Sequence, residues 1–582
     1  MPLVEIRVPA GVRSNGTELE SANRWLDANL VRWRDGSIQP IGGWTIRTKT
    51  GATVSEVPRG AIGWVDNSFN SNIAIGTANK LFYISSGSVV SDITPAGLAT
   101  GTEDANLNAG FGGGYYGTGA YGTIRQTTGV YESCTTWSLD TWGEYLVGCA
   151  SSDGKLYEWQ LNTANPAAAI TNAPVDCSGL VVTEERFIFA LAAGGNPRKV
   201  QWCDKEDNTT WAPSATNEAG DFELQTQGEI LSGHRLRGRT LIITTTDAHI
   251  ATYIGPQLVY SFERVGTSCG SISRQACVAN QEGAYWMGQN GFFMFNGSSV
   301  QEIPCEVFDY VFTDINTSQK SKIWAVLNSK FGEAWWFYPS AGSNEIDRYV
   351  VYDYKENHWN IGKMNRSAGF DSGVFRNPIW LDSDGGMYNQ EVGFNYGSGL
   401  PYLESGPLTI GNEIVKVNNV IPDERSQGEV KLTFKSRLYP NLQERSYGPY
   451  SSTRPLSVRF SGRHIKMRID AEYQIDSGST LSGLQKASTK FYPYKDLFNV
   501  VINGRLLGDL NNDGRVSSAD SLVYLKYTQG VSIDPDETDY IENVFHPYIL
   551  ENPVEYAEFI TNTNNDWRFG VPKLNVIQGG RR

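Results

Sequence analysis

The sequence has no apolar run that approaches the roughly 20 residues needed by a membrane-spanning helix. Its first residues, MPLVEIRVPAG, contain no basic segment followed by an apolar core, which is the pattern of a secretory leader. Both absences argue against a membrane protein and against export. We therefore expect a chain without a membrane segment that is made in a cytoplasm and stays soluble.

Cysteine and histidine are scarce and scattered, at 7 and 5 of 582 residues. No two cysteines form a CxxC pair and no histidine lies near one, so neither a zinc site nor a disulfide framework is indicated. Buried free thiols are expected instead. No GxSxG, HExxH or phosphate-binding glycine loop occurs where a strand-to-helix turn would support it. We therefore predict that the protein is not an enzyme.

Positive charge is also in short supply. The chain has 49 Lys and Arg against 63 Asp and Glu, a net charge of -14. Affinity for phosphates comes from clustered Lys and Arg, so a protein that wraps nucleic acid with a basic surface is disfavoured. An acidic surface repels a polyanion and keeps it from sticking, which suits a conduit better than a binder.

Glycine and aromatic residues, in contrast, are abundant: Gly 61, Trp 16, Tyr 29 and Phe 24, with only 19% charged residues. This balance is typical of turn-rich all-β proteins. Residues 61–400 repeat short strand-like runs broken by polar turns, and two hairpins, YLVGCASSDGKLYEW and AYWMGQNGFFMFNG, nearly match in form. Their spacing is close to the length of a four-stranded blade, which predicts a β-propeller of six or seven blades. A set of β-sandwiches is the alternative.

After residue 400 the strands become longer and alternate. Val430, Leu432 and Phe434 alternate with polar residues, which indicates a strand with one buried face. We predict a β-sandwich-like domain formed by residues 401–473 and 565–582, in which HIKMRIDAEY finds its partner strand at DWRFGVPKLNVI. Residues 474–564 form an insertion between them, and residues 1–60 an amino-terminal assembly segment.

The insertion contains the sharpest chemical signal, the twelve residues DLNNDGRVSSAD. A calcium loop of the EF-hand type supplies oxygen ligands from positions 1, 3, 5, 7, 9 and 12, with glycine at position 6 for the turn. Gly514 occupies the turn. The predicted Ca²⁺ ligands are Asp509, Asn511, Asp513, the carbonyl of Arg515, Ser517 and Asp520. The loop and the helix predicted after it resemble a type I dockerin, whereas an ordinary Asn/Asp/Gly turn is the simpler alternative. We expect the ion to stabilise a small module whose own hydrophobic core is insufficient.

Stretches at both ends and in the middle of the chain resemble the tail nozzle, or packaged-DNA stabilisation, proteins of short-tailed bacteriophages. The first of them reads NGTELESANRWLDANLVRWRDGSIQPIGGW. The matching stretches are residues 15–44, 110–125, 137–159, 196–224, 347–359, 460–472 and 566–582. The resemblance implies a β-propeller subunit of a virion, assembled as a homo-oligomeric ring, commonly a hexamer. It also implies contacts with the tail adaptor and tail fibre proteins, and DNA passing through the ring without sequence recognition during ejection. The insertion departs from this family and is an addition to it.

Two segments leave alternatives open. The Gly/Tyr-rich residues 110–121 are either a loop that projects into the channel and gates it, or a surface loop or subunit contact. Residues 15–44 are rich in Arg and Trp, which anchor interfaces, and either contact another subunit or the adaptor, or close the propeller.

The rival function is a secreted propeller lectin or glycosidase that carries a dockerin-type module. Dockerins normally carry two calcium loops and an export signal, but this chain shows one clear loop and no leader. A third hypothesis, compatible with the nozzle, is that the insertion binds a host glycan or protein. Its residues 533–560 contain eight acidic residues and no Lys or Arg, and such a run is usually a solvated face.

Overall fold

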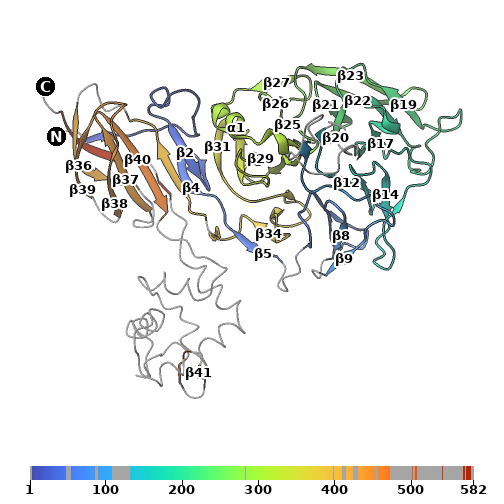
Figure 1. The fold of residues 1–582 in the computed structure, drawn as a ribbon, viewed down its shortest axis with the longest axis horizontal. Coiled ribbons are helices and arrows are strands. Elements are labelled where there is room, and N and C mark those ends of the chain that lie inside the picture. Colours follow the sequence, from blue (N-terminus) through green and yellow to red (C-terminus); the bar gives the residue numbers. More distant parts are fainter. Residues whose placement is uncertain are drawn as a thin grey trace, which may run out of the picture.

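The computed structural model describes residues 3–47, 54–85, 89–107, 131–281, 283–397, 399–408, 414–423, 430–451, 456–471, 501–502, 505–506, 541, 568–569 and 572–578. A propeller lies at one end of the molecule and a two-sheet domain at the other (Figure 1). Within the described residues, no helix has the length and apolar character needed to cross a membrane.

Seven four-stranded antiparallel sheets form the propeller, so the prediction of an all-β propeller is confirmed. The blades are numbered in chain order. Blades one to three are β6 (Gly60–Val65), β7 (Ser71–Gly76), β8 (Leu81–Ile84) and β9 (Val90–Asp92); β12 (Trp137–Trp142), β13 (Tyr145–Ala150), β14 (Leu156–Trp159) and β15 (Ala168–Ala169); and β16 (Gly179–Val182), β17 (Ile188–Leu191), β18 (Lys199–Trp202) and β19 (Gly220–Glu223). Blades four to six are β20 (Ile230–Leu236), β21 (Arg239–Thr244), β22 (Asp247–Gly255) and β23 (Val259–Thr267); β24 (Cys277–Ala279), β25 (Ala284–Met287), β26 (Phe292–Phe295) and β27 (Val300–Ile303); and β28 (Trp324–Asn328), β29 (Glu333–Tyr338), β30 (Arg348–Asp353) and β31 (His358–Lys363).

The seventh blade takes its outer strand from the other end of the chain. It contains β32 (Ala368–Phe370), β33 (Ile379–Leu381), β34 (Met387–Gln390) and β5 (Trp44–Ile46), with Trp44 opposite Gln390. The innermost strands β6, β12, β16, β20, β24, β28 and β32 contact one another in turn, and β32 returns to β6. The amino-terminal segment therefore closes the propeller, which was one of the two alternatives for it.

Two sheets form the sandwich domain. The five-stranded sheet has the order β2 (Trp25–Asn29), β35 (Tyr402–Ser405), β40 (His464–Ala471), β37 (Val430–Arg437), β38 (Arg445–Ser451). The four-stranded sheet has the order β1 (Leu3–Glu5), β43 (Lys573–Gln578), β36 (Val415–Ile421), β39 (Leu456–Gly462). Val430, Leu432 and Phe434 are all buried, as their alternation predicted.

The predicted pairing of HIKMRIDAEY with the carboxy-terminal strand is wrong. Strand β40 lies between β35 and β37, whereas β43 lies between β1 and β36 in the opposite sheet. The reason is that the amino-terminal segment supplies β1 as the neighbour of β43. The two strands meet through the core between the sheets instead of through backbone hydrogen bonds.

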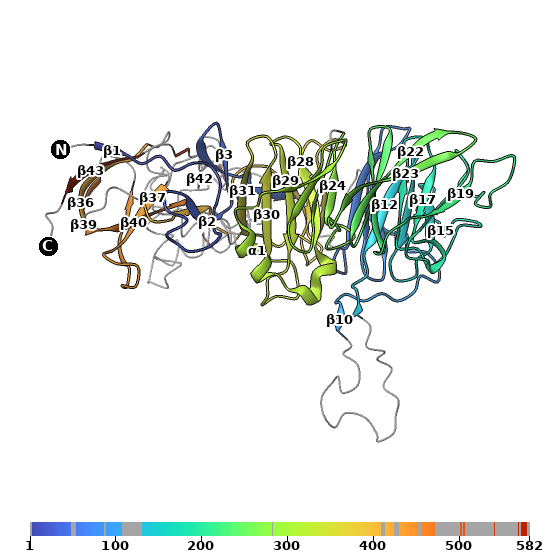
Figure 2. The same ribbon diagram turned by 90° about the horizontal axis from the view of Figure 1, so that it is seen from above.

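The remaining elements are short. They are the hairpin β3 (Val31–Arg34) and β4 (Ser37–Pro40), the ladder β10 (Asn106–Leu107) and β11 (Tyr131–Glu132), the helices η1 (Ala193–Gly195), α1 (Phe308–Asp314) and η2 (Thr317–Lys322), and the pair β41 (Val501–Ile502) and β42 (Arg505–Leu506). The β10–β11 ladder stands away from the blades (Figure 2).

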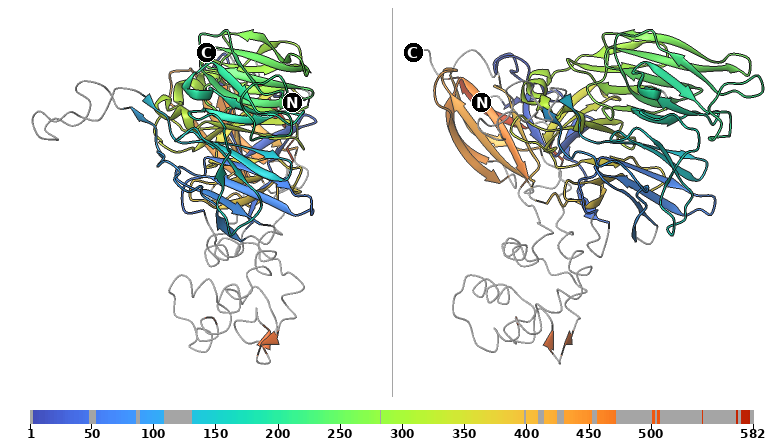
Figure 3. Two further views of the ribbon diagram at one scale, coloured as in Figure 1. Left: turned by 90° about the vertical axis from the view of Figure 1, so that its right-hand side faces the viewer. Right: turned by 45° about the vertical axis from the view of Figure 1, so that its right-hand side comes forward.

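Residues 3–46, which we call the strap, run between the two domains and contribute strands to both (Figures 1 and 2). Edge strand β2 of the sandwich contacts β31, the outer strand of the sixth blade. One hydrophobic cluster is continuous from blades five and six through the strap into the sandwich. The propeller, the strap and the sandwich therefore share a core, and the sandwich lies beside the sixth blade (Figure 3).

Candidate functional sites in the strap junction and the propeller channel

The predicted calcium ligands Asp509, Asn511, Asp513, Arg515, Ser517 and Asp520 lie outside the described residues. The Gly/Tyr-rich residues 110–121 also lie outside them, so the gating hypothesis stays a prediction. In the part of the chain that the structure describes, no cluster of three or more His, Cys, Asp or Glu could hold a metal ion.

The best-defined polar site of the strap is built around Arg32 of β3, which is only 4% exposed. Its Nε and Nη2 each donate to Glu333 at 2.9 Å, and Nη1 donates to Glu391 at 2.9 Å. The guanidinium also lies over the Phe331 ring, 3.6 Å from its centroid. Burial alone would lower the pKa of Arg32, but the two carboxylates outweigh it and raise the pKa. The strap is therefore tied to blade six and to the end of blade seven by one buried cation.

The carboxylates of Glu333 and Glu391 also accept hydrogen bonds from other donors. Trp335 Nε1 donates to Glu333 at 3.0 Å, and the backbone N–H of Gly42 donates to Glu391 at 2.9 Å. Asn328 Nδ2 lies between the carboxylates and donates to Glu391 at 2.9 Å. Burial raises the pKa of Glu333, and Arg32 opposes that rise.

On the other side, the strap is held to the sandwich by Glu18, which pairs with Arg437 and Lys466. Burial opposes ionisation of Glu18, but the hydrogen bonds from these cations outweigh it and lower its pKa. Lys466 also pairs with Glu444 at 2.8 Å. Ion pairs on both sides thus fix the strap against the propeller and the sandwich.

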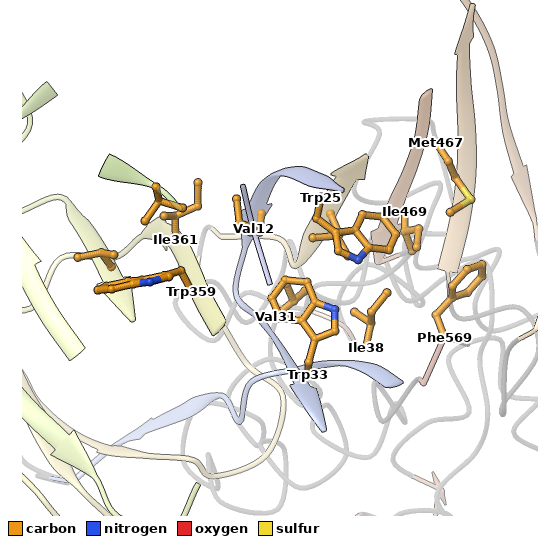
Figure 4. Packing of buried hydrophobic residues seen from close by; sticks show 14 of the residues in the cluster. Val12, Trp25, Val31, Trp33, Ile38, Trp359, Ile361, Met467, Ile469 and Phe569 are labelled. Atoms are coloured by element: carbon orange, nitrogen blue, oxygen red, sulfur yellow. The ribbon is translucent and has the colours of Figure 1, made fainter. Parts of the chain in front are cut away.

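Apolar side chains of the strap pack against residues of the sixth blade and of the sandwich (Figure 4). Trp25 and Trp33 of the strap are 2% and 3% exposed and pack in one cluster with Trp359, Met467 and Phe569. These five residues belong to four of the stretches that carry the resemblance to tail nozzle proteins, residues 15–44, 347–359, 460–472 and 566–582. Segments from both ends of the sequence and from its middle therefore converge on one junction.

The propeller channel is a second candidate site. It encloses a cavity of about 1010 Å³ lined by residues from all seven innermost strands and their adjoining turns. Its lining carries charges of both signs: Asp140, Glu184, Arg235, Arg237 and Arg274, together with His234. Binding pockets for small molecules have about this size, roughly 300–1,000 Å³.

The polar groups of the channel are held by backbone contacts. Asp140 accepts hydrogen bonds from the backbone N–H groups of Val182 at 2.9 Å and Thr141 at 2.8 Å, and lies 3.6 Å from Arg235. Burial raises the pKa of Asp140, and Arg235 opposes the rise. Burial lowers the pKa of His234 to about 4, so this imidazole is neutral at physiological pH. Sequence reasoning nominated none of these residues, because they come from different blades with no common spacing.

The seven cysteines are free, and all but the half-buried Cys305 are buried, which confirms the prediction of buried thiols. Burial raises the pKa of every one, to about 12 for Cys177, Cys203 and Cys305.

One stretch, GTSCG at residues 266–270, has the GxSxG spacing. It leads from β23 towards β24 and not into a helix, so it lacks the context of a nucleophile elbow. Among the described residues, no histidine is hydrogen-bonded to Ser268. This arrangement offers no activated nucleophile.

No family model matches the sequence, and no curated protein matches it either. Comparison with solved structures gives matches of low identity. Virginiamycin B lyase from Staphylococcus aureus is 9% identical over 58% of this chain and 95% of its own, with a TM-score of 0.35. PorZ, a surface component of the type-IX secretion system of Porphyromonas gingivalis, is 8% identical over 66% of this chain and 45% of its own, with a TM-score of 0.32.

Proposed function

We propose that this chain is a structural virion protein of a short-tailed bacteriophage. In this proposal several copies, commonly six, form the ring of the tail nozzle, which retains DNA and conducts it during ejection. The neighbours of the ring are the tail adaptor and tail fibre proteins. The chain contributes no catalysis.

The observation that carries the proposal is the convergence at the strap. The resemblance to nozzle proteins is spread over stretches far apart in sequence, and four of these stretches pack against one another around Trp25 and Trp33. A chance resemblance would have no reason to select segments that share one core. Their convergence supports a common architecture, in which the strap fixes the sandwich against the propeller.

The size of the channel decides which route DNA takes in this proposal. A cavity of about 1010 Å³ suits a small molecule, and Gln275 lies at its wall, donating to the carbonyls of Arg59 at 2.8 Å and Trp137 at 2.9 Å. A volume of that size does not hold a length of DNA duplex, whose major groove alone is about 12 Å wide. The conduit is therefore the space enclosed by several copies, and the blades form its wall. A net charge of -14 is compatible with a wall to which DNA does not adhere.

In this proposal the insertion at residues 474–564 is a calcium-stapled addition to the nozzle subunit. Asp509, Asn511, Asp513, Arg515, Ser517 and Asp520 would bind Ca²⁺ through oxygen atoms, as the loop sequence predicts. The ion would stabilise the insertion without taking part in chemistry.

The test is to locate the chain in purified virus particles from its source. We expect quantitative mass spectrometry to find it at a fixed ring stoichiometry relative to the portal. Immunogold labelling with antibodies against the propeller should decorate the distal tail. Absence of the chain from tailed particles, or its accumulation only as a secreted monomer, would refute the proposal.

A matched pair of variants sharpens this test. Arg32→Met removes the buried cation of the strap, whereas Arg34→Met removes an exposed one from the same strand, 59% exposed and 4.0 Å from Asp35. In complementation of a phage that lacks this chain, we expect particles to incorporate Arg34→Met and to exclude Arg32→Met. Equal incorporation of the two variants would show that the strap junction does not matter for assembly.

A further inference from the structure

A polar groove of about 870 Å³ lies between blades four and five. Its walls are the turn between β21 and β22, the turn between β25 and β26, and the connections that lead into β20 and β24. Strands β21, β22, β25 and β26 lie near one another in Figure 1. The groove is separate from the strap junction, and the proposed nozzle function does not use it.

A buried carboxylate, Asp247, lies in the wall of the groove and is 5% exposed. Its Oδ1 accepts hydrogen bonds from the hydroxyl groups of Thr226 at 2.7 Å and Thr244 at 2.5 Å, and lies 3.3 Å from His249 Nε2. Its Oδ2 accepts no hydrogen bond from the described residues. Oδ2 is not fully shielded from solvent and lies on the open side of the carboxylate. Oδ1 is fixed by these contacts, and Oδ2 is left free to accept a hydrogen bond from a ligand in the groove.

Four exposed amide side chains line the same groove: Gln225, Gln227, Gln289 and Asn290. Within the described part of the chain, none of the four makes a side-chain hydrogen bond to another protein group. Each amide presents a donor and an acceptor side by side. This arrangement matches a pair of neighbouring hydroxyl groups, each of which both donates and accepts.

The groove also offers one flat apolar surface. Phe293 is half-buried and stacks on Trp286, with ring centroids 6.0 Å apart and an interplanar angle of 28°. An aromatic face packs well against the C–H face of a sugar ring. The only cation in the lining is Arg264, opposite the negative charge of Asp247, so the groove lacks the excess of positive charge that phosphate or sulfate ligands need.

We propose that this groove binds a neutral oligosaccharide through vicinal hydroxyl groups. Asp247 Oδ2 accepts from one hydroxyl, the amides at the rim exchange hydrogen bonds with others, and Phe293 supports the ring. The inference rests on the groove alone, so exclusion of the chain from virus particles would leave it standing.

The test is binding of the full-length chain to an immobilised panel of defined oligosaccharides. The panel contains neutral hexose and N-acetylhexosamine oligomers and their sialylated and sulfated counterparts. The best neutral probe is then titrated in solution against the variants. Asp247→Asn keeps the shape of the side chain and removes the free carboxylate oxygen, and we expect it to weaken binding about tenfold or more. Asp221→Asn, an equal charge change on the outer strand β19, is the matched control and should bind as the wild type does.

A second variant guards against misfolding of the first. Gln289→Ala with Asn290→Ala changes two exposed side chains, so it should leave the thermal unfolding midpoint unchanged and still weaken binding several-fold. If Asp247→Asn lowers the unfolding midpoint, the binding of the double variant tests the proposal instead. The proposal is overturned if no neutral probe binds, if only sialylated or sulfated probes bind, or if folded variants of both kinds bind as tightly as the wild type.

Discussion

Replacing Arg32 with methionine tests whether the strap fixes the propeller to the sandwich. The substitution keeps an unbranched side chain of similar length but removes four hydrogen bonds to Glu333 and Glu391. Asn328, Trp335 and the backbone of Gly42 still donate to these carboxylates. The carboxylates of Glu333 and Glu391, however, lose their only close cation among the described residues.

Removing one partner of a buried ion pair typically costs about 3–5 kcal/mol, because the other charge stays buried without compensation. We expect a loss of that size in the free energy of unfolding at neutral pH. Burial already raises the pKa of Glu333, and loss of Arg32 raises it further. A carboxyl group whose folded pKa is raised favours folding at low pH, and that contribution is lost as the pH rises through the folded pKa. The deficit of the variant should therefore be largest near pH 7 and shrink towards about pH 5.

Urea unfolding followed by tryptophan fluorescence measures this deficit, since Trp335 and Trp359 lie at the junction. Limited proteolysis should at the same time show earlier cleavage of the strap. Arg34→Met is the control and should stay within about 0.5 kcal/mol of the wild type, because exposed ion pairs contribute little. A deficit for Arg32→Met below about 1 kcal/mol, or one equal at pH 5 and pH 7, would refute the reasoning.

Three further predictions follow from the structure and the sequence. Burial raises the pKa of all seven thiols, so the native protein should react with fewer than one equivalent of a thiol reagent within minutes at pH 8. The denatured protein should react with seven equivalents. Fast labelling of the native protein would contradict this prediction. Burial lowers the pKa of His234 from 6.5 to about 4, so its contribution to stability is present above pH 6.5 and is lost as the pH falls towards 4. In His234→Gln, the free energy of unfolding in urea should therefore decline less across that range. An unchanged decline would argue against burial of the imidazole. Calorimetric titration of the full chain should detect Ca²⁺ binding that Asp509→Ala with Asp513→Ala abolishes while the propeller keeps its melting temperature, and undiminished binding would place the ion elsewhere.

The propeller was predictable from sequence because each blade repeats one local pattern. Short apolar strands joined by polar turns, as in β13 with β14 and β25 with β26, carry their information within about 15 residues. The number of blades could not be fixed, because β5 is separated from its partner β34 by more than 300 residues. Three residues of strand, Trp44–Ile46, carry no periodicity of their own.

The sandwich shows the same limit. Alternation correctly identified the buried face of β37, because a two-residue period is local. Which strand lies next to which is a non-local choice, and the sequence pattern of β40 is equally compatible with β43 or β37 as a neighbour. The choice is made by the strap, whose strands β1 and β2 occupy one edge of each sheet. Sites assembled from several blades, such as Asp140 with Arg235 or Asp247 with Gln289, were missed because residue spacing within a single blade does not encode them.

The strap couples closure of the propeller to the placement of the sandwich. Residues 3–46 supply the edge strand of both sandwich sheets and the outer strand of blade seven, with Arg32 buried between those contributions. Residues 35–43 alone separate β3 from β5, so docking of β3 on Glu333 and Glu391 holds β5 close to blade seven. Docking of β3 in turn brings β2 beside β31 and thereby sets the angle of the sandwich. A subunit of a closed ring needs such a fixed angle, because an error in the angle accumulates around the ring and prevents closure. A flexible linker would leave that angle free, so a strap that fixes it would suit the ring that we propose.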